Sequence, residues 1–238
     1  MRIRLPMGRT AFFLGAFAFA LLALLPLRLA ADWFGFAARG LVAREATGSI
    51  WFGGLREAQL GPVPVGDVTA RLNSLPLLLG RARVSLRRDD EANPFRGAIT
   101  LSRHAFGVDD ATGQLRVGAL FAPLPVAMIE ADDVSAGFAN GQCARAEGNV
   151  RATLAGEVAG IGLPSGFAGT ASCAGDAVLL PLASQTGMER LELRLFADGR
   201  FRADLSIRPT DEALRGRLVA AGFQEANGLA LRRIDGRF

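Results

Sequence analysis

The sequence predicts a mainly β protein, with a single N-terminal transmembrane helix followed by a long, mostly antiparallel β-sheet body with one or two short helices. Three observations support this fold class. An uncharged apolar segment opens the chain, short runs of alternating apolar and polar residues follow it, and an Asp-Gly dipeptide separates two such runs. A period of two is typical of half-buried strands, because successive side chains of a strand point to opposite faces of the sheet.

The N-terminal segment has the length of a membrane span. Residues 11–27 carry no charge, and the roughly 21 residues that follow Thr10, at about 1.5 Å each, match a hydrocarbon core of about 30 Å. Arg2, Arg4 and Arg9 precede the span. By the positive-inside rule, these arginines place the N-terminus in the cytoplasm and the remainder of the chain outside it.

A cleaved signal peptide has a similar charged start and is the alternative to a membrane anchor. The apolar run is longer than the usual core of a signal peptide, about 7–15 residues, and no A-x-A cleavage site follows it. We therefore expect a cytoplasmic tail and signal anchor at residues 1–31 and one periplasmic β-rich domain at residues 32–238. No second span is predicted, because the apolar run at residues 75–80 is too short.

The first half of the body contains several short alternating runs, which predict strands. The runs are VGDVTARLN at 65–73, ARVSLRR at 82–88, GAITLSR at 97–103 and TGQLRVG at 112–118. Between the first two, the segment SLPLLLGRA predicts a short turn of helix beneath the sheet.

The clearest element is an antiparallel hairpin over residues 189–209. Leucines alternate along its first arm and apolar residues alternate along its second, so Leu193 and Leu205 are expected on the inward face. Arg194 falls on the opposite, solvated face. Asp198-Gly199 lies between the arms, and this dipeptide is favoured in tight type I′ turns.

One helix follows the hairpin, and a last strand follows the helix. Thr210 is the predicted N-cap, Leu214, Leu218 and Ala221 form an apolar stripe at helical spacing, and Gly222 ends the helix. The closing segment GLALRRIDGRF predicts a strand. Its expected inward residues are Leu229, Leu231 and Ile234.

Two cysteines, Cys143 and Cys173, lie on the predicted outward side, where an oxidising compartment permits disulfides. A structural zinc site is excluded, since His104 is the sole histidine and no C-x-x-C motif occurs. Two unpaired buried thiols are the alternative. We predict a Cys143–Cys173 disulfide, because the compartment and the even cysteine count favour it.

Composition and motifs indicate neither a nucleic-acid binder nor an enzyme. All 27 basic residues are arginines, but they are dispersed among 23 acids and the net charge is only +4. The sequence contains no G-x-S-x-G, Walker or H-E-x-x-H motif. The doublets Asp109-Asp110 and Asp132-Asp133 could supply carboxylates, but neighbours on a strand point to opposite faces, so at most one of each pair could serve a site. We therefore expect no catalytic residue, cofactor or metal.

The ordered set of motifs resembles protein N of the type II secretion system, the GspN family. After the span comes G-x-[hydrophobic]-W-x-G, here Gly48 to Gly53, followed by LPLLLGRARVSL. NGQCARAEGNV around the first cysteine, GTASCAG around the second and DGRFRADLSIRP near the end complete the set. The resemblance implies a non-enzymatic, single-pass inner-membrane accessory of the machine that exports folded proteins across the outer membrane. Its partners would be other inner-membrane subunits of that machine.

The same family resemblance suggests a second hypothesis, because the β-rich body is also similar to AsmA-type proteins, which build lipid-carrying grooves. Under this hypothesis the protein binds or transfers envelope lipids, and Leu193 and Leu205 would line the groove. A continuous apolar concave face on an incompletely closed sheet would favour it.

The segment GSIWFGG, residues 48–54, is interpreted as structural. With bends at Gly48 and Gly53, it predicts a short strand that begins the sheet, with Trp51 packed on one face. Docking of a partner on Trp51 is the less favoured alternative.

Overall fold

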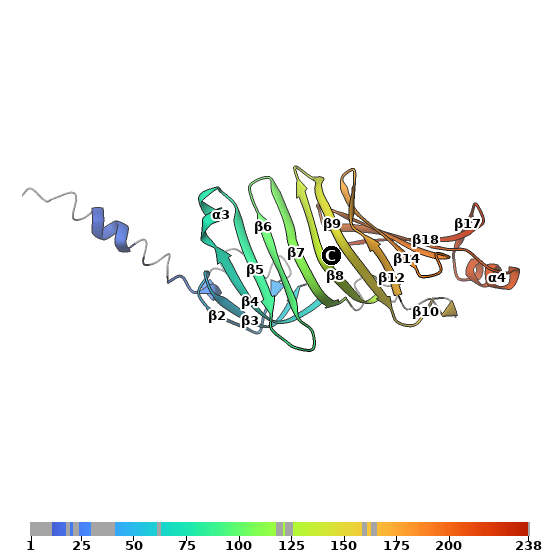
Figure 1. Cartoon of the computed structure of the whole chain (residues 1–238), viewed down its shortest axis with the longest axis horizontal. Helices are drawn as coiled ribbons and strands as arrows, with labels where there is room; N and C mark the ends of the chain where they lie inside the picture. Colours follow the sequence, from blue (N-terminus) through green and yellow to red (C-terminus); the bar gives the residue numbers. More distant parts are fainter. Residues whose placement is uncertain are drawn as a thin grey trace, which may run out of the picture.

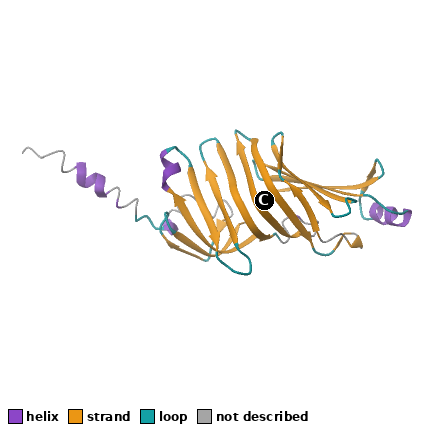
Figure 2. Cartoon of the chain, viewed as in Figure 1, coloured by secondary structure: helices purple, strands orange, loops and turns teal. Residues whose placement is uncertain are grey.

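The computed structural model describes residues 11–17, 20, 24–29, 41–60, 63–117, 121, 126–158, 161–162 and 166–237. Antiparallel strands dominate this part of the chain (Figure 1, Figure 2), as the sequence predicts. The first nine are β1 (Leu41–Val42), β2 (Glu45–Gly48), β3 (Gly53–Leu60), β4 (Val63–Asn73), β5 (Ala82–Arg88), β6 (Phe95–Leu101), β7 (Ala105–Arg116), β8 (Val126–Ala139) and β9 (Gln142–Leu154).

Nine further strands follow among the described residues, and the helices α3 and α4 interrupt the series. The strands are β10 (Glu157–Val158), β11 (Ile161–Gly162), β12 (Gly166–Thr170), β13 (Ser172–Ala174), β14 (Ala177–Ser184), β15 (Glu189–Phe196), β16 (Arg200–Ile207), β17 (Gln224–Ala226) and β18 (Leu229–Arg237). The helices are α3 (Ser74–Leu78) and α4 (Glu212–Ala220).

One sheet joins almost all the described strands. Its order is β1-β3-β4-β5-β6-β7-β8-β9-β12-β14-β15-β16-β18-β17, with β2 paired to β3 and β13 paired to β14. β10 and β11 form a separate two-stranded sheet. Most neighbours in the large sheet are consecutive in the chain, which is the meander that short alternating runs separated by turns produce.

The predicted transmembrane helix is only partly described. Residues 11–17 are helical. Among the described residues, the structure contains no helix with both the length and the apolar character that a membrane crossing requires. Residues 18–19, 21–23 and 30–31 of the predicted span lie outside the described residues, and the span stays a prediction.

The two faces of the sheet differ in polarity, and we call them the apolar face and the polar face. In the first half, one row of directly paired residues on the apolar face crosses from β4 to β9: Leu72, Val84, Ile99, Val108, Ala136 and Ala146. In the second half, the same face carries Phe167, Leu182, Leu191 and Leu205. The apolar face therefore continues across both halves of the sheet.

Three of the β-bulges that interrupt the ladders of the first half lie at acidic residues with a positive φ. These residues are Glu57 (φ 47°), Asp110 (φ 52°) and Asp133 (φ 54°). The backbone N–H of each donates to a side chain on an adjacent strand, namely Asp67 Oδ1 at 2.8 Å, Ser135 Oγ at 3.0 Å and Thr112 Oγ1 at 3.3 Å. Bulges bend a strand and increase its twist, so these three account for curvature in this half of the sheet.

In the second half the sheet folds over its own apolar face. Side chains of β8 and β9 and side chains of β14, β15 and β16 line one apolar space of about 10 Å³ together with Phe121. The Phe121 ring meets the Phe201 ring edge-on, with 5.2 Å between centroids. Leu205 is 0% exposed and Leu193 5%. We call this region, β8 to β18 with α4, the packed half.

The hairpin predicted at residues 189–209 is confirmed as β15 and β16, but its turn type is not. Gly199 has a φ of +83°, whereas Asp198 is not among the residues with positive φ. The Gly199 N–H donates to the Phe196 carbonyl at 3.1 Å. Three residues therefore connect the arms in a type I turn that ends on a left-handed glycine; a type I′ turn would need two positive φ angles.

The Arg200 side chain and N–H donate to the Asp198 carboxylate and lower the pKa of Asp198.

The predicted helix is confirmed as α4, with its N-cap one residue later than expected. Asp211, and not Thr210, caps it: Asp211 Oδ1 accepts from the Leu214 N–H at 2.6 Å. The helix stops where predicted, at Gly222 with a φ of +87°. The Phe223 N–H donates to the Leu218 carbonyl at 3.0 Å, which completes a Schellman motif and buries the Phe223 ring.

Two expectations about which parts of the chain face the core are wrong. In β18, Ala230 pairs with Ile207 and Ile234 pairs with Ala203, so the inward residues are Ala230 and Ile234, while Leu229 and Leu231 lie on the other face. The alternation in this strand is ambiguous because both sets contain apolar residues.

The second wrong expectation concerns α3. The segment is helical, as predicted, but it does not lie beneath the sheet. Leu75 is 77% exposed and Leu79 is 79% exposed. The helix connects the ends of β4 and β5 at the rim of the sheet (Figure 1), where no second layer of the described chain covers it.

Candidate functional site

The apolar face of strands β4 to β7 is only partly covered, and we call this region the open half. Its central residues keep substantial exposure: Ile99 36%, Leu101 48%, Phe106 43% and Val108 39%. The Phe106 ring stacks on the Phe138 ring, with 5.3 Å between centroids, and Phe138 belongs to the buried core. The open half is therefore continuous with the packed core, and it presents a band of apolar side chains that could bind an apolar ligand or protein surface.

The sheet curls at the end of the open half where the bulges lie. There, Arg88 reaches across the apolar side and donates to the carbonyl groups of Val65 on β4 and Gln114 on β7, at 2.7 and 3.0 Å, and to that of Asn93 at 2.6 Å. A cavity of about 740 Å³ opens here, lined by residues of β3, β4, β5 and β7. The Arg88 side chain reaches from β5 to β7, two strands away, so the sheet bends toward its apolar face, which is therefore the concave one.

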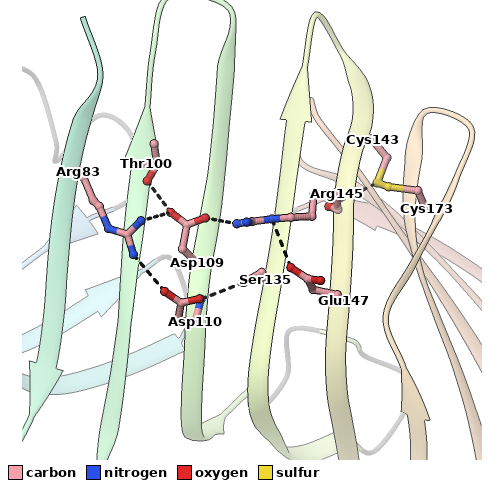
Figure 3. Close-up of polar contacts among 9 residues, drawn as sticks. All are labelled: Arg83, Thr100, Asp109, Asp110, Ser135, Cys143, Arg145, Glu147 and Cys173. Carbon is pink, nitrogen blue, oxygen red and sulfur yellow. Dashed lines mark hydrogen bonds and ion pairs between the residues drawn. A yellow bond between two sulfur atoms is a disulfide. The ribbon is translucent and has the colours of Figure 1, made fainter. Parts of the chain in front are cut away.

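The polar face of the same strands is held by an ion network around Asp109 (Figure 3). The Asp109 side chain is 12% exposed. It accepts from Thr100 Oγ1 at 2.5 Å, from Arg83 Nη1 at 3.2 Å and from Arg145 Nη2. Asp110 accepts from the other nitrogen of the Arg83 fork, Nη2, at 3.1 Å. These contacts tie β5, β6, β7 and β9 together.

The expectation that Asp109 and Asp110 point to opposite faces is wrong. Both carboxylates contact Arg83, because the left-handed conformation of Asp110 at the bulge breaks the alternation of the strand. A carboxylate surrounded by guanidinium groups and a hydroxyl has its acceptor capacity satisfied, so we assign this network a structural role. Asp132 and Asp133, in contrast, are exposed at the bulge of β8.

The predicted cysteine pair lies on β9 and β13. In the structure Cys143 and Cys173 are joined by a disulfide, with 5.6 Å between their Cα atoms (Figure 3). The Cys143 N–H donates to the Gly175 carbonyl at 3.3 Å, so the backbone also holds the β13–β14 turn against β9. The geometry is compatible with the predicted bridge.

The segment Gly48 to Gly53 is a turn and not the short strand that the sequence predicts. Gly48 ends β2 and pairs directly with Gly53, which begins β3, so Trp51 lies in the connection between them. The φ of Gly48 is +81°, and a Cβ there would lie 2.3 Å from the Phe52 carbonyl oxygen, which explains why glycine is required. Trp51 is half-buried, so it contributes less to packing than a tryptophan in the core would.

The end of the predicted span contacts this turn. The Ile50 N–H donates to the Leu25 carbonyl at 3.1 Å, and Pro26 forms a β-bridge with Ser49. A Cβ on Gly53 would lie 2.4 Å from Leu27 Cδ2, so Leu27 packs directly on that glycine. The glycines at 48 and 53 therefore shape a turn that receives residues 25–27.

Comparison with known protein families decides the identity of the chain. The family described as type II secretion system (T2SS), protein N, matches residues 39–232. The chain belongs to the type II secretion system protein N family. The match begins before the Gly48–Gly53 turn and ends within β18, so it covers nearly all of the large sheet together with α3 and α4. No curated protein and no solved structure matches the chain.

Membership of the protein N family confirms the resemblance inferred from the sequence motifs. Members of this family are components of a secretion machine, and the family is not a known enzyme family. His104 is exposed between β6 and β7, where its carbonyl accepts from the Asn140 N–H at 2.8 Å. In the described part of the chain, no group of three or more His, Cys, Asp or Glu residues is placed to hold a metal ion.

Sequence reasoning missed the open half as the candidate binding surface and chose Leu193 and Leu205 instead. These two leucines are buried in the packed half, so they are closed to a ligand. A signal for the exposed region was present in GAITLSR and HAFGV, whose apolar residues alternate as well as those of the hairpin. Only the arrangement of the strands in the folded sheet determines which alternating segments are covered by a second layer.

Proposed function

We propose that this member of the protein N family is a non-enzymatic accessory subunit of the type II secretion system that supports export of folded proteins across the outer membrane. It is anchored in the inner membrane by one span, with its N-terminus in the cytoplasm and residues 32–238 in the periplasm. Its partners are other inner-membrane subunits of the machine. The family match over residues 39–232 is the observation that carries this proposal.

The geometry supports a role in binding. The open half presents partly exposed apolar residues on one face, and the polar face of the same strands is stiffened by the Asp109 network. A rigid sheet with one incompletely covered apolar face can bind a partner without rearranging its own core. The contact of residues 25–27 with the Gly48–Gly53 turn holds the end of the predicted span against the sheet.

Deletion of the gene is expected to reduce, without abolishing, the export of folded substrates, because the subunit is an accessory. The measurement is the exported fraction of a type II substrate, together with immunoblots of the neighbouring inner-membrane subunits. Complementation with the His104→Ala variant is expected to restore export to the wild-type level, since no proton transfer is required of His104. Unchanged export and unchanged subunit levels in the deletion strain would contradict the proposal.

A second candidate function is the binding or transfer of envelope lipids. The specific observation in its favour is the apolar face, which is continuous, concave at its curled end and open at β4 to β7. Among the described strands, the edge strands β1 and β17 do not pair with each other. Acyl chains are the natural ligands for such a surface, because they need apolar contact and no hydrogen-bond partners.

The lipid candidate predicts that a photoreactive residue at Ile99 or Leu101 forms phospholipid adducts in cells. The matched control is Arg96, which lies on the same strand and is exposed on the polar face. Adducts confined to the two apolar positions, together with acyl chains retained in native mass spectrometry of the purified body, would support lipid binding. Protein adducts at Ile99 and Leu101, with no lipid adducts there, would exclude it and support the secretion assembly.

A further inference from the structure

The rim of the sheet at α3 exposes an unusual amount of apolar surface. In the described chain from residue 41 onward, the most exposed large apolar side chains are Leu79 (79%), Leu75 (77%) and Phe52 (62%). Leu75 and Leu79 are four residues apart, so they lie on the same side of the helical turn, pointing away from the sheet. Nothing in the fold of the described chain needs these leucines at the surface.

All three residues lie at one end of the β3–β4 ladder. Gly53, which follows Phe52 at the start of β3, pairs with Ala70 on β4. Ser74, the first residue of α3, comes four residues after Ala70, or on the order of 13 Å along the strand. The guanidinium group of Arg71 sits over the Phe52 ring, 4.5 Å from its centroid, and links the two sites.

The end of the predicted span is held at the same place. Residues 25–27 contact the turn that contains Phe52, through the Ile50–Leu25 hydrogen bond and the Pro26–Ser49 bridge. Residues 25–27 are the last of the uncharged run that ends before Arg28, so the turn they contact, and the rim next to it, lie close to the membrane surface. In Figure 1, α3 lies at this end of the molecule and α4 at the opposite end.

The charge of the rim also fits a membrane. The segments 68–88 and 95–108, which contain α3 and the β6–β7 turn, have no acidic residue. They contribute the exposed cations Arg71, Arg81 and Arg103. Leucines flanked by arginines are typical of segments that insert apolar side chains among acyl chains while the cations contact anionic headgroups.

We propose that α3 is a second, peripheral membrane contact: Leu75 and Leu79 insert into the outward leaflet of the membrane that holds the anchor, and Arg81 and Arg103 contact its anionic headgroups. The inference rests on the proposed single-pass anchoring. The occupant is a bilayer surface. It is distinct from the acyl ligand considered for the open half, whose residues lie on the concave face.

The test uses the full chain reconstituted in nanodiscs of phosphatidylethanolamine and phosphatidylglycerol, with a photoreactive residue at Leu79. The matched control is Val219 on α4, which is 48% exposed at the far end of the molecule. We expect phospholipid adducts at Leu79 and none at Val219. We also expect fewer adducts at Leu79 in nanodiscs of phosphatidylcholine alone, because the headgroup charge is then lost.

A second variant separates membrane contact from folding. With the photoreactive residue at Leu77, the Leu75→Ser/Leu79→Ser double substitution is expected to abolish lipid adducts while the thermal midpoint stays that of the parent protein, because both side chains are solvent-exposed. Adducts that persist in this variant would overturn the proposal, as would protein adducts alone at Leu79.

A third position distinguishes failure of this inference from failure of the anchor. Phe17 lies within the predicted span. Lipid adducts at Phe17 but none at Leu79 would overturn the peripheral contact and leave the anchor intact. An absence of lipid adducts at both positions would overturn the anchor and the contact that depends on it.

Discussion

Replacing Leu205 with alanine is expected to lower the free energy of unfolding by about 2–5 kcal/mol. Leu205 is 0% exposed and pairs with Leu191 at the centre of the packed half. Truncation removes apolar contacts and leaves a cavity that the surrounding strands can close only in part, because ladder hydrogen bonds fix their positions. This substitution therefore has one of the largest effects available to a single change in the chain.

Urea denaturation of the purified protein, with the disulfide intact, measures this effect. Leu101→Ala is the matched control: it removes the same atoms from a strand of the open half, where the side chain is 48% exposed. We expect the control substitution to lower the free energy of unfolding by less than about 1 kcal/mol. Equal losses for the two variants would mean that the open half is covered as completely as the packed half, and would contradict the division drawn between them.

Removing the Cys143–Cys173 bridge is expected to cost about 3–4 kcal/mol of stability. The cysteines are 30 residues apart in the chain, so the bridge closes a long loop and restricts the unfolded ensemble. The change to make is the double substitution Cys143→Ser/Cys173→Ser, which leaves no single thiol to form wrong pairs. Its free energy of unfolding is compared with that of the wild-type protein by denaturation.

Reduced wild-type protein is the control, because it lacks the bond but keeps both sulfur atoms. It should match the double variant to within about 1 kcal/mol. Alkylation of protein taken from the periplasm, without reductant, should leave both cysteines unmodified. Modified thiols in that sample would show that the bond does not form in the cell.

Several features of the fold could be predicted because their causes are local in the chain. The hairpin at residues 189–209 has alternating leucines on one arm and a glycine that can take a positive φ in its turn. The end of α4 depends on Gly222, which adopts at little steric cost the left-handed conformation that closes the Schellman motif. The family signature around Gly48 was likewise visible, since a turn this tight demands glycine whatever the rest of the fold does.

Register could not be predicted from alternation alone. In β18 both sets of alternate residues contain apolar side chains, and the pairing of Ala230 with Ile207 selects the inward set. At Asp109-Asp110 the alternation itself fails, because the conformation of Asp110 depends on the Ser135 hydroxyl of the neighbouring strand. Both outcomes are determined by a partner strand that is distant in sequence.

From the sequence alone, the residues determined a mainly antiparallel chain, the places of its tightest turns and the family to which its motifs belong. Only the tertiary structure decided which apolar segments are covered. Leu193 and Ile99 both lie on the apolar face of strands in which apolar and polar residues alternate. Nevertheless, Leu193 is 5% exposed and Ile99 is 36% exposed. The difference arises because the sheet folds over its own apolar face at β14 to β16 but only curls at β4 to β7, and burial depends on that second layer and not on the side chain itself.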